Sequence, residues 1–377
     1  MSPNTFDVIV LGLGAMGSAA VCVLARRGRR VLGVEQFPLV HDQGSSHGHT
    51  RAIRKAYFEH PDYVPLLHQA YAGWYELEQQ TGRHLFTEAG CLSIGKPHGE
   101  LVAGVKRAAA EHRLPVEELT GDDVRRRFPA FQLPEHEVGV LERDAGFLYV
   151  EECVRAFLDE ARHRGAELHE NEPVLSWDAT ASGVTVRTRR QEYTAAKLII
   201  TAGAWASQAL ADLNLPLVVR RKVLLWFATQ NDSLFRRDGF PVYMVETTSG
   251  FYYGFPVLDA HGLKVARHDG GAVVADPLGV DRAVRESDEM ECRQFLQVYL
   301  PPANGPRRHG KVCLYTMTPD QHFIVDAHPR HENVVLAAGF SGHGFKFAPV
   351  IGAVLADLAE QGETTQPIGM FRLSRFG

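Results

Sequence analysis

A glycine-rich turn near the C-terminal end of the chain carries a single lysine and is well suited to bind a ligand. An apolar run ends at three glycines, the lysine follows, and a helical pattern comes next; these are Gly339, Gly342, Gly344, Lys346 and residues 348–360. Glycine lets backbone amides approach a ligand closely, and the start of a helix adds partial positive charge. The segment therefore predicts a site for an anionic or electron-rich group.

A second glycine motif lies at the opposite end of the chain. An apolar run over residues 6–11 leads to Gly12, Gly14 and Gly17 and then to a helical pattern, and Glu35 closes the next apolar run. In dinucleotide-binding folds such glycines join a strand to a helix whose start faces the pyrophosphate, and the acid accepts a hydrogen bond from a ribose hydroxyl. We therefore predict a dinucleotide site. The alternative, a glycine-rich turn in an ordinary α/β protein, leaves Glu35 unexplained.

Two histidines and two arginines lie in a loop over residues 44–54, shortly after the second predicted strand. Loops at this place in α/β sheets lie near the cofactor crevice. Arg51 and Arg54 are three residues apart, so in a helix they would share one face and suit a carboxylate or a phosphate. Two solvated arginines on a surface loop are the alternative.

Five other residues have both a chemical and a structural interpretation. Lys264 and His268 fall on one face of a strand predicted over residues 262–268, where a desolvated ammonium can stabilise an anion formed during turnover; an exposed strand face is the alternative. Met244 and Tyr253 flank a turn, and their spacing alone favours core packing. Cys313, taken singly, is better explained as a small buried hydrophobe than as a reactive thiol.

The composition excludes several classes of protein. The chain has 377 residues, of which 45% are hydrophobic and 23% charged, so it is long enough for two domains. A net charge of -5 provides no basic field for nucleic acid. No leader and no apolar run of membrane-spanning length is present, so we expect a cytoplasmic protein. The five dispersed cysteines contain no Cys-x-x-Cys pair, which predicts neither a disulfide framework nor a zinc site, and we expect no metal ligands.

The distribution of glycine turns and alternating runs along the sequence predicts an α/β protein with two domains. Residues 1–85, 145–220 and 315–377 contain strand-to-helix glycine turns and are expected to form one discontinuous domain. Residues 86–144 and 221–314 contain short alternating runs typical of an antiparallel sheet. This second domain would cover one side of a cleft, and the cofactor would lie on the opposite side.

Five motifs together resemble the monomeric sarcosine oxidase and N-methyltryptophan oxidase family of flavoproteins, with the greatest likeness to the sarcosine oxidases. They occur in the family's order and approximate spacing at residues 12–17, 46–51, 252–256, 312–316 and 339–347. The resemblance implies a Rossmann-like FAD-binding domain of the glutathione-reductase type with an inserted antiparallel-sheet α+β substrate domain. The isoalloxazine ring would lie between the two.

The resemblance also implies which residues hold the cofactor. Gly12, Gly14, Gly17 and Glu35 match the residues that bind the ADP half of FAD, and Cys313 matches the cysteine that is joined to the 8α-methyl carbon of the flavin. Further cofactor contacts are expected from Ser45, Thr50, Gly339, Gly344 and Lys346.

Arg54 and Lys346 match the pair that binds the substrate carboxylate in this family, and Lys264 matches the lysine that activates oxygen. Further site residues are expected close to the flavin ring, at His47, Arg51 and His268, and around the substrate, at Met244, Tyr253, Tyr315 and Gly342. Two cations would orient an amino acid by its carboxylate and leave its secondary amine and adjacent C–H over flavin N5.

The implied protein is a monomeric oxidase whose partners are a secondary amino acid and oxygen. Its first candidate substrate is sarcosine, which would give glycine, formaldehyde and hydrogen peroxide. N-methyltryptophan, pipecolate, proline and glycated amino acids are alternatives, because His49 stands where close sarcosine oxidases carry an acid, and Arg267 and Asp269 flank His268. A pyridine-nucleotide dehydrogenase and a non-catalytic flavin-binding subunit are the rivals.

Overall fold

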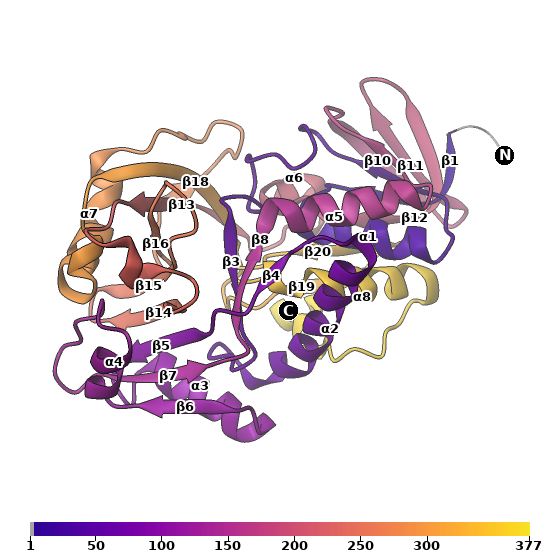
Figure 1. Cartoon of the computed structure of the whole chain (residues 1–377). Helices are drawn as coiled ribbons and strands as arrows, with labels where there is room; N and C mark the ends of the chain where they lie inside the picture. Colours follow the sequence, from indigo (N-terminus) through magenta and orange to yellow (C-terminus); the bar gives the residue numbers. More distant parts are fainter. Residues whose placement is uncertain (1–3) are drawn as a thin grey trace.

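A computed structural model describes residues 4–377 of the chain. Figure 1 shows two large sheets side by side, with a small sheet running between them. The small sheet has the order β3-β8-β4. Its strands are β3 (Thr50–Ile53), β4 (Phe86–Thr87) and β8 (Gly146–Tyr149).

The first large sheet has eight strands and begins with the N-terminal glycine motif. Its main path is β10-β11-β12-β1-β2-β9, while β20 pairs with β12 and β19 pairs with β20. The strands are β1 (Thr5–Leu11), β2 (Val31–Val34), β9 (Glu167–His169), β10 (Val174–Thr180), β11 (Gly183–Thr188), β12 (Glu192–Ile200), β19 (Ile324–His328) and β20 (His331–Ala338).

Both glycine turns leave this sheet at one edge. Strands β1, β2, β12 and β20 run parallel, and Leu11 pairs with Val34 on one side and with Ile200 on the other. The carboxyl ends of these strands therefore meet, which is where ligands bind in open α/β sheets. The predicted α/β class, with a nucleotide-binding half of this kind, is confirmed.

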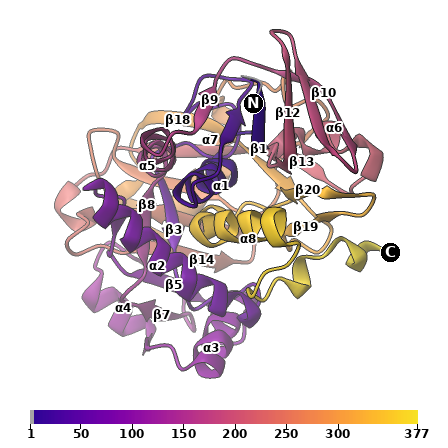
Figure 2. The ribbon, with the colours of Figure 1, turned by 90° about the vertical axis from the view of Figure 1, so that its right-hand side faces the viewer.

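Helices cover the first sheet and bury its apolar side. They are α1 (Ala15–Arg26), α2 (Val64–Thr81), α5 (Val150–His163), the short α6 (Ala206–Ala209) and α8 (Ala348–Gln361). Figure 2 shows α1 and α8 lying against each other, with α2 beside α8. A Cβ on Gly352 would lie 2.7 Å from the backbone of Ala19, so glycine permits this close helix contact. The N-terminal ends of α1 and α8 consequently sit next to each other, each just after a glycine turn.

The second large sheet has nine strands and is almost wholly antiparallel, as expected; only the β5–β14 pair is parallel. Its strands are β5 (Cys91–Gly95), β6 (Val116–Leu119), β7 (Val138–Glu142), β13 (Val218–Phe227), β14 (Val242–Thr247), β15 (Gly250–Phe255), β16 (Leu263–Arg267), β17 (Val273–Val274) and β18 (Arg307–Met317). The associated helices are α3 (Glu100–His112), α4 (Gly121–Arg127) and α7 (Glu286–Tyr299). β13 and β18 each cross a predicted domain boundary by a few residues. We retain the predicted domain boundaries as a proposal.

The structure shows the conformation of the segment that carries Arg51 and Arg54. Arg51 lies in strand β3, and Arg54 directly follows it, so the helical case in which the two would share one face does not apply. Pairing with β8, from Thr50–Tyr149 to Ile53–Gly146, imposes the extended form. None of the helices in residues 4–377 is both long and apolar enough to traverse a lipid bilayer.

Candidate active site

The first glycine turn is shaped by close backbone contacts. Gly12 has a φ of 88°, and a Cβ on it would lie 2.6 Å from the carbonyl oxygen of Thr201. A Cβ on Gly17 would lie 1.8 Å from the carbonyl oxygen of Gly12, so α1 can begin this close to the turn only with glycine there. The start of α1 is thereby held at the edge of the sheet, where it can face an anionic ligand.

Glu35 and the 44–54 loop close over this turn. The buried Glu35 carboxylate accepts hydrogen bonds from the amides of Leu13 (2.8 Å) and Phe37 (3.1 Å). The hydroxyl of Ser46 accepts from the amide of Ala15 at 3.1 Å. Glu35 therefore fixes the shape of the turn as well as bordering the space beside it.

A cavity of about 820 Å³ runs from the first glycine turn to the second. Its lining includes Gly12, Gly14, Glu35, Ser45, Arg51, Tyr315, Gly339, Gly342 and Gly344. Two buried polar atoms that belong to lining residues, Trp205 Nε1 and Thr316 Oγ1, have no hydrogen-bond partner among the described residues. A cavity of this size with donors of this kind fits a long, partly polar cofactor.

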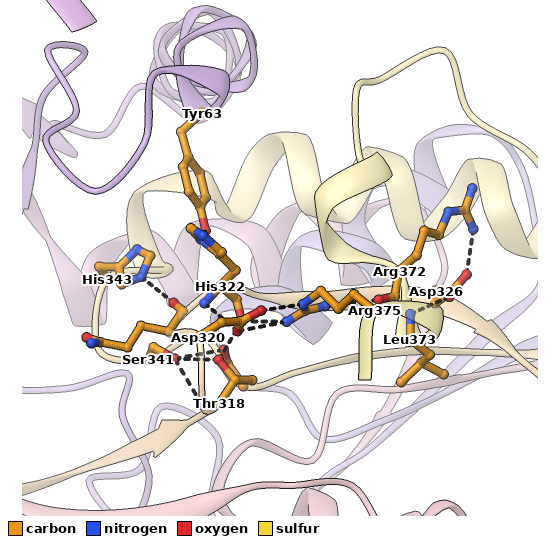
Figure 3. A network of polar contacts seen from close by, with 12 residues as sticks. Tyr63, Thr318, Asp320, His322, Asp326, Ser341, His343, Arg372, Leu373 and Arg375 are labelled. Atoms are coloured by element: carbon orange, nitrogen blue, oxygen red, sulfur yellow. Dashed lines mark hydrogen bonds and ion pairs between the residues drawn. The ribbon is translucent and has the colours of Figure 1, made fainter. Parts of the chain in front are cut away.

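The second glycine turn rests on a polar network, drawn in Figure 3. The ring of His343 bonds to the carbonyl of Gln321 (2.9 Å), and the Tyr63 hydroxyl bonds to His322 (3.1 Å). The hydroxyl of Ser341 accepts from the amide of Thr318 at 3.2 Å. These bonds fix the loop that carries the glycines, so its amides are ordered before any ligand binds.

Cys313 is fully buried beside the cavity wall. Its Sγ lies 3.4 Å from Nη2 of Arg51, and the same nitrogen donates to the carbonyl oxygen of Ser45 at 2.8 Å. Burial raises the pKa of three other thiols, those of Cys22, Cys91 and Cys292, to about 12. Among the described cysteines, Cys313 is the one that this arginine contacts.

Arg54 and Lys346 come together on Tyr57. The guanidinium of Arg54 lies 4.4 Å from the centre of the Tyr57 ring, and Lys346 Nζ lies 3.3 Å from its hydroxyl. Arg54 Nη2 also donates to both carboxylate oxygens of Glu59, at 2.9 and 2.7 Å. Burial, and after it the charge of Arg54, lowers the pKa of Lys346 to about 7. Burial alone would raise the pKa of Glu59, but Arg54 brings it down to about 2.

Lys264 is held in a closed cage. Its Nζ donates to the carbonyl oxygens of Gly48 (2.6 Å) and Thr50 (2.9 Å) and to the Thr50 hydroxyl (3.1 Å). The rings of Trp226 and Phe255 lie 5.2 and 4.6 Å from the nitrogen. Burial lowers the pKa of Lys264 well below its usual range. The exposed strand face considered above is therefore excluded for Lys264, which is 2% exposed.

The buried rings of Tyr253 and Tyr315 and the half-buried imidazole of His268 lie close together near the cations. The hydroxyls of Tyr253 and Tyr315 are 3.2 Å apart, and the His268 ring centre lies 6.2 and 5.7 Å from their ring centres. Met244 pairs with Tyr253 across the β14–β15 hairpin. Burial, and then nearby Lys222, lowers the pKa of His268 to about 4.

His47 is buried but has no hydrogen-bond partner for either ring nitrogen within the described part of the chain. Burial, followed by the charge of Arg51, lowers its pKa to about 3. A neutral imidazole with two free nitrogens beside Arg51 can accept or donate one hydrogen bond toward a ligand.

Comparisons with known proteins identify the family. Residues 7–358 match the model of the FAD dependent oxidoreductase family. The chain belongs to this family. It is 44% identical to the monomeric sarcosine oxidases of Streptomyces avermitilis and Bacillus sp. strain B-0618, over 98% of this chain and 97% and 96% of theirs. It is 37% identical to the N-methyl-L-tryptophan oxidase of Salmonella arizonae, over 98% of this chain and 99% of that enzyme.

Solved structures of amino acid oxidases share the fold. The Tyr258Phe variant of the amino acid oxidase NikD superimposes with a TM-score of 0.88 at 24% identity, covering 98% of this chain and 97% of the other. Glycine oxidase from Geobacillus kaustophilus does so with a TM-score of 0.82 at 22% identity, covering 99% of both chains. The family assignment excludes the pyridine-nucleotide dehydrogenase that the first motif also allowed.

The structure brings most residues predicted for the FAD-dependent enzyme into two neighbouring groups. Gly12, Gly14, Gly339, Gly342 and Gly344 border the large cavity with Glu35, Ser45, Arg51 and Tyr315, whereas Gly17 does not line it and Thr50 lies with Lys264 away from it. Arg54, Lys346, Tyr253 and Met244 are buried near one another, with the half-buried His268, around Tyr57 and Tyr315.

Several residues near the site were missed: Tyr57, Trp205 and Thr316, already described, and the charged residues Lys222 and Glu59. Lys222 Nζ lies 5.3 Å from the centre of the Tyr315 ring and donates to the carbonyl oxygen of Asp269 at 2.5 Å. Burial lowers the pKa of Lys222 to about 8. A lysine inside an apolar strand was a signal that could have found it. Glu59 had no such signal, since nothing in the sequence pairs it with Arg54.

Proposed function

We propose that this protein is an FAD-dependent oxidase of secondary amino acids, with sarcosine as the first candidate substrate. The observation that carries the proposal is the convergence of Arg54 and Lys346 on Tyr57, close to the cluster of Tyr253, Tyr315 and His268. The similarity to sarcosine and N-methyltryptophan oxidases over nearly the whole chain supports it. These cations also speak against a non-catalytic flavin-binding subunit.

The carboxylate of the substrate would take the place that Glu59 now holds on Arg54. Both N–H···O contacts to Glu59 come from Nη2 of Arg54, and Arg54 Nε has no partner among the described residues. A substrate carboxylate would also bond to Lys346. Among the described residues, Lys346 makes no hydrogen bond to Glu59. Two cations in a buried site can fix a small amino acid in one orientation.

Several residues would hold the FAD. Gly12, Gly14 and Glu35 border the cavity at the start of α1, and Gly339 to Gly344 border it at the second turn. Trp205 Nε1 and Thr316 Oγ1, which lack partners in the described chain, would bond to it. Bound FAD would supply a two-electron acceptor that takes a hydride equivalent from the carbon beside the amine and reduces oxygen to hydrogen peroxide. Water would hydrolyse the resulting imine, giving glycine and formaldehyde from sarcosine.

The remaining residues would set the environment of this reaction. Lys264 would provide a fixed positive charge beside reduced oxygen, and its three oxygen acceptors hold it in one position. Met244, Tyr253 and Tyr315 would exclude water from the amine. Arg51, His47 and His268 would contact the flavin ring or the substrate.

We also propose that FAD is attached through Cys313. Forming the thioether would release a proton from Sγ and a hydride equivalent from the 8α-methyl group, with the bound flavin and then oxygen as the electron acceptors. The contact between Sγ and Arg51 supports this, because Arg51 borders the cavity and holds the sulfur beside it. The name of the sarcosine oxidase relatives supports a monomer. We retain cytoplasmic location as a proposal.

Peroxide release tests the function. The purified holoenzyme is given sarcosine, N-methyltryptophan, pipecolate, proline and a glycated amino acid, and peroxide is measured with a coupled peroxidase. We expect the highest kcat/KM with sarcosine. Peroxide from none of these amines would reject the oxidase, and a higher value with another amine would reject sarcosine. Acid precipitation followed by peptide mapping tests the flavin bond: yellow colour should stay with the peptide that contains Cys313, and free FAD in the supernatant would contradict it.

A further inference from the structure

A cluster of histidines lies outside the large cavity, above the cage of Lys264. His49 comes from the loop before β3, Asp259 and His261 from the turn between β15 and β16, and His309 from β18. His49, Asp259 and Lys264 border one small pocket. The proposed oxidation uses none of the three histidines, although they lie next to a lysine assigned to it.

Three of these residues have the geometry of metal ligands. His49 Nδ1 lies 3.7 Å from one carboxylate oxygen of Asp259, and His261 Nδ1 lies 2.8 Å from the other. One ligand atom from each of the three residues lies within 4.8 Å of the others. Tetrahedral Zn²⁺ with bonds of about 2.0–2.1 Å has ligand atoms roughly 3.3 Å apart. Since the side chains are 33–45% exposed, modest rotations would bring the nitrogens to that spacing.

His309 supplies a fourth candidate ligand. Its ring centre lies 4.7 Å from that of His261, 6.1 Å from that of His49 and 5.0 Å from that of Trp226. The β13–β18 pairing shifts register just beyond Trp226 and His309. His309 itself pairs with Trp226 before this shift, and its ring lies next to those of the other two histidines.

The backbone at His49 is unusual as well. His49 has a φ of 68°, in the left-handed region that a non-glycine residue adopts at a cost. Its amide donates to the carboxylate of Glu151, which holds this conformation. The same segment gives the carbonyls of Gly48 and Thr50 to Lys264. His49 thus lies between the two residues whose carbonyls bond to Lys264.

We propose that His49, Asp259 and His261, with His309 as a fourth ligand, bind a divalent transition metal such as Zn²⁺. Imidazole nitrogens and one carboxylate suit Zn²⁺, Ni²⁺ or Cu²⁺, whereas Mg²⁺ and Ca²⁺ prefer an all-oxygen set. A bound ion would tie the turn before β16 to the segment before β3. It would therefore stiffen the backbone that holds Lys264, whatever amine the enzyme oxidises. None of the proposed ligands is a cysteine, so the cysteine pattern gave no sign of this site. The ligands also come from three separate segments of the chain.

Calorimetric titration of the metal-free holoenzyme with Zn²⁺ tests the site. We expect one saturable site per chain, and no binding of Mg²⁺ at the same concentration. His261→Ala and His309→Ala should weaken Zn²⁺ binding at least about tenfold, since even partners outside the ligand set are commonly worth that much. His163→Ala, at the exposed end of α5, is the matched control and should bind like the parent. An unchanged affinity in His261→Ala would overturn the proposal, as would the absence of a saturable site in the parent.

Thermal unfolding and spectroscopy provide readouts that do not depend on activity. Zn²⁺ in excess should raise the Tm of the parent and of His163→Ala, but raise that of His261→Ala less, because only tight binding to the folded state stabilises it. X-ray absorption of the Zn²⁺ complex should show nitrogen and oxygen neighbours; sulfur neighbours would overturn the assignment. Bound flavin and circular dichroism are measured for each variant, and Asp259→Asn replaces any variant that loses either. Unchanged Zn²⁺ binding in that variant would overturn the role of the carboxylate.

Discussion

Lys264 and the Arg54–Lys346 pair are both buried cations close to the proposed flavin site, yet their surroundings differ. Lys264 is surrounded by neutral oxygens, two carbonyls and a hydroxyl, which belong to one short segment. Arg54 is held by the carboxylate of Glu59. The first arrangement is complete without a ligand, whereas the second contains an anion that a substrate carboxylate can replace. The difference indicates that Lys264 acts by its fixed position and that Arg54 acts by exchanging partners.

The largest effect is expected for Lys264→Met. If the fixed charge acts on reduced oxygen, flavin reoxidation should slow by about 10²–10³-fold, as when one preorganised electrostatic donor is removed. Flavin reduction by the amine should change little. Stopped-flow spectroscopy follows the two half-reactions separately. Lys264→Arg, which keeps the charge, is the control, and an equal loss in both half-reactions would exclude this role for Lys264.

The next effect concerns the carboxylate site. In Arg54→Met, sarcosine should bind more weakly by about 1.5–3 kcal/mol, the usual value of a hydrogen bond to a charged group. This corresponds to roughly 10–150-fold in the dissociation constant, measured from the rate of flavin reduction against substrate concentration.

The Arg54 variant needs two controls. Removing Arg54 leaves the buried Glu59 charge without its partner, so Arg54→Met/Glu59→Gln separates lost binding from lost stability. Arg236→Met changes an exposed arginine and should bind sarcosine normally. An unchanged dissociation constant in both Arg54 variants would show that Arg54 does not bind the substrate carboxylate.

The pH dependence of binding follows from Lys346. Its pKa of about 7 means that it is charged below that pH and loses its proton above it. A carboxylate ligand without an amine should therefore bind fully below about pH 6 and about tenfold more weakly by pH 9, the loss of one charged hydrogen bond. His268 and His343, with pKa values of about 4 and 3, and Glu59, at about 2, keep one charge state over this range. Lys222, with a pKa of about 8, also titrates here, but it lies at the Tyr315 ring and not at Arg54, so the Lys346→Met variant shows whether it contributes.

Flavin absorbance changes report this binding without the complication of a titrating substrate amine. Lys346→Met should bind the ligand weakly at every pH, with a flat profile. A profile in Lys346→Met that still falls between pH 6 and 9 would assign the titration to another group.

The features of these two cation sites that could be predicted from the sequence are those set by neighbouring residues in the chain. The helix predicted over residues 348–360 is α8, Ala348–Gln361, because glycines before it and apolar spacing within it define its start and its face. The form of the 50–54 segment depends on pairing with β8, much later in the chain, so the sequence left open whether Arg51 and Arg54 lie in a helix, and the structure shows that they do not. The oxygen cage of Lys264 and the placement of Glu59 depend on tertiary contacts between distant or irregular segments. No periodicity or motif records such contacts.

Glu59→Gln gives the smallest effect and the most direct test of partner exchange. The neutral amide should hold Arg54 less strongly than the carboxylate does, since charge-assisted hydrogen bonds are about twice as strong as neutral ones. Sarcosine should then bind about fivefold more tightly, or about 1 kcal/mol, while the ligand-free enzyme loses thermal stability because the Arg54 charge lacks a counter-ion. Glu289→Gln is the control, since that carboxylate is also buried and pairs with two arginines, but lies on α7. If Glu59→Gln lowers the Tm and leaves sarcosine binding unchanged, Glu59 serves only to stabilise the fold. Arg54 would then need no exchange of partners, and its site would resemble that of Lys264.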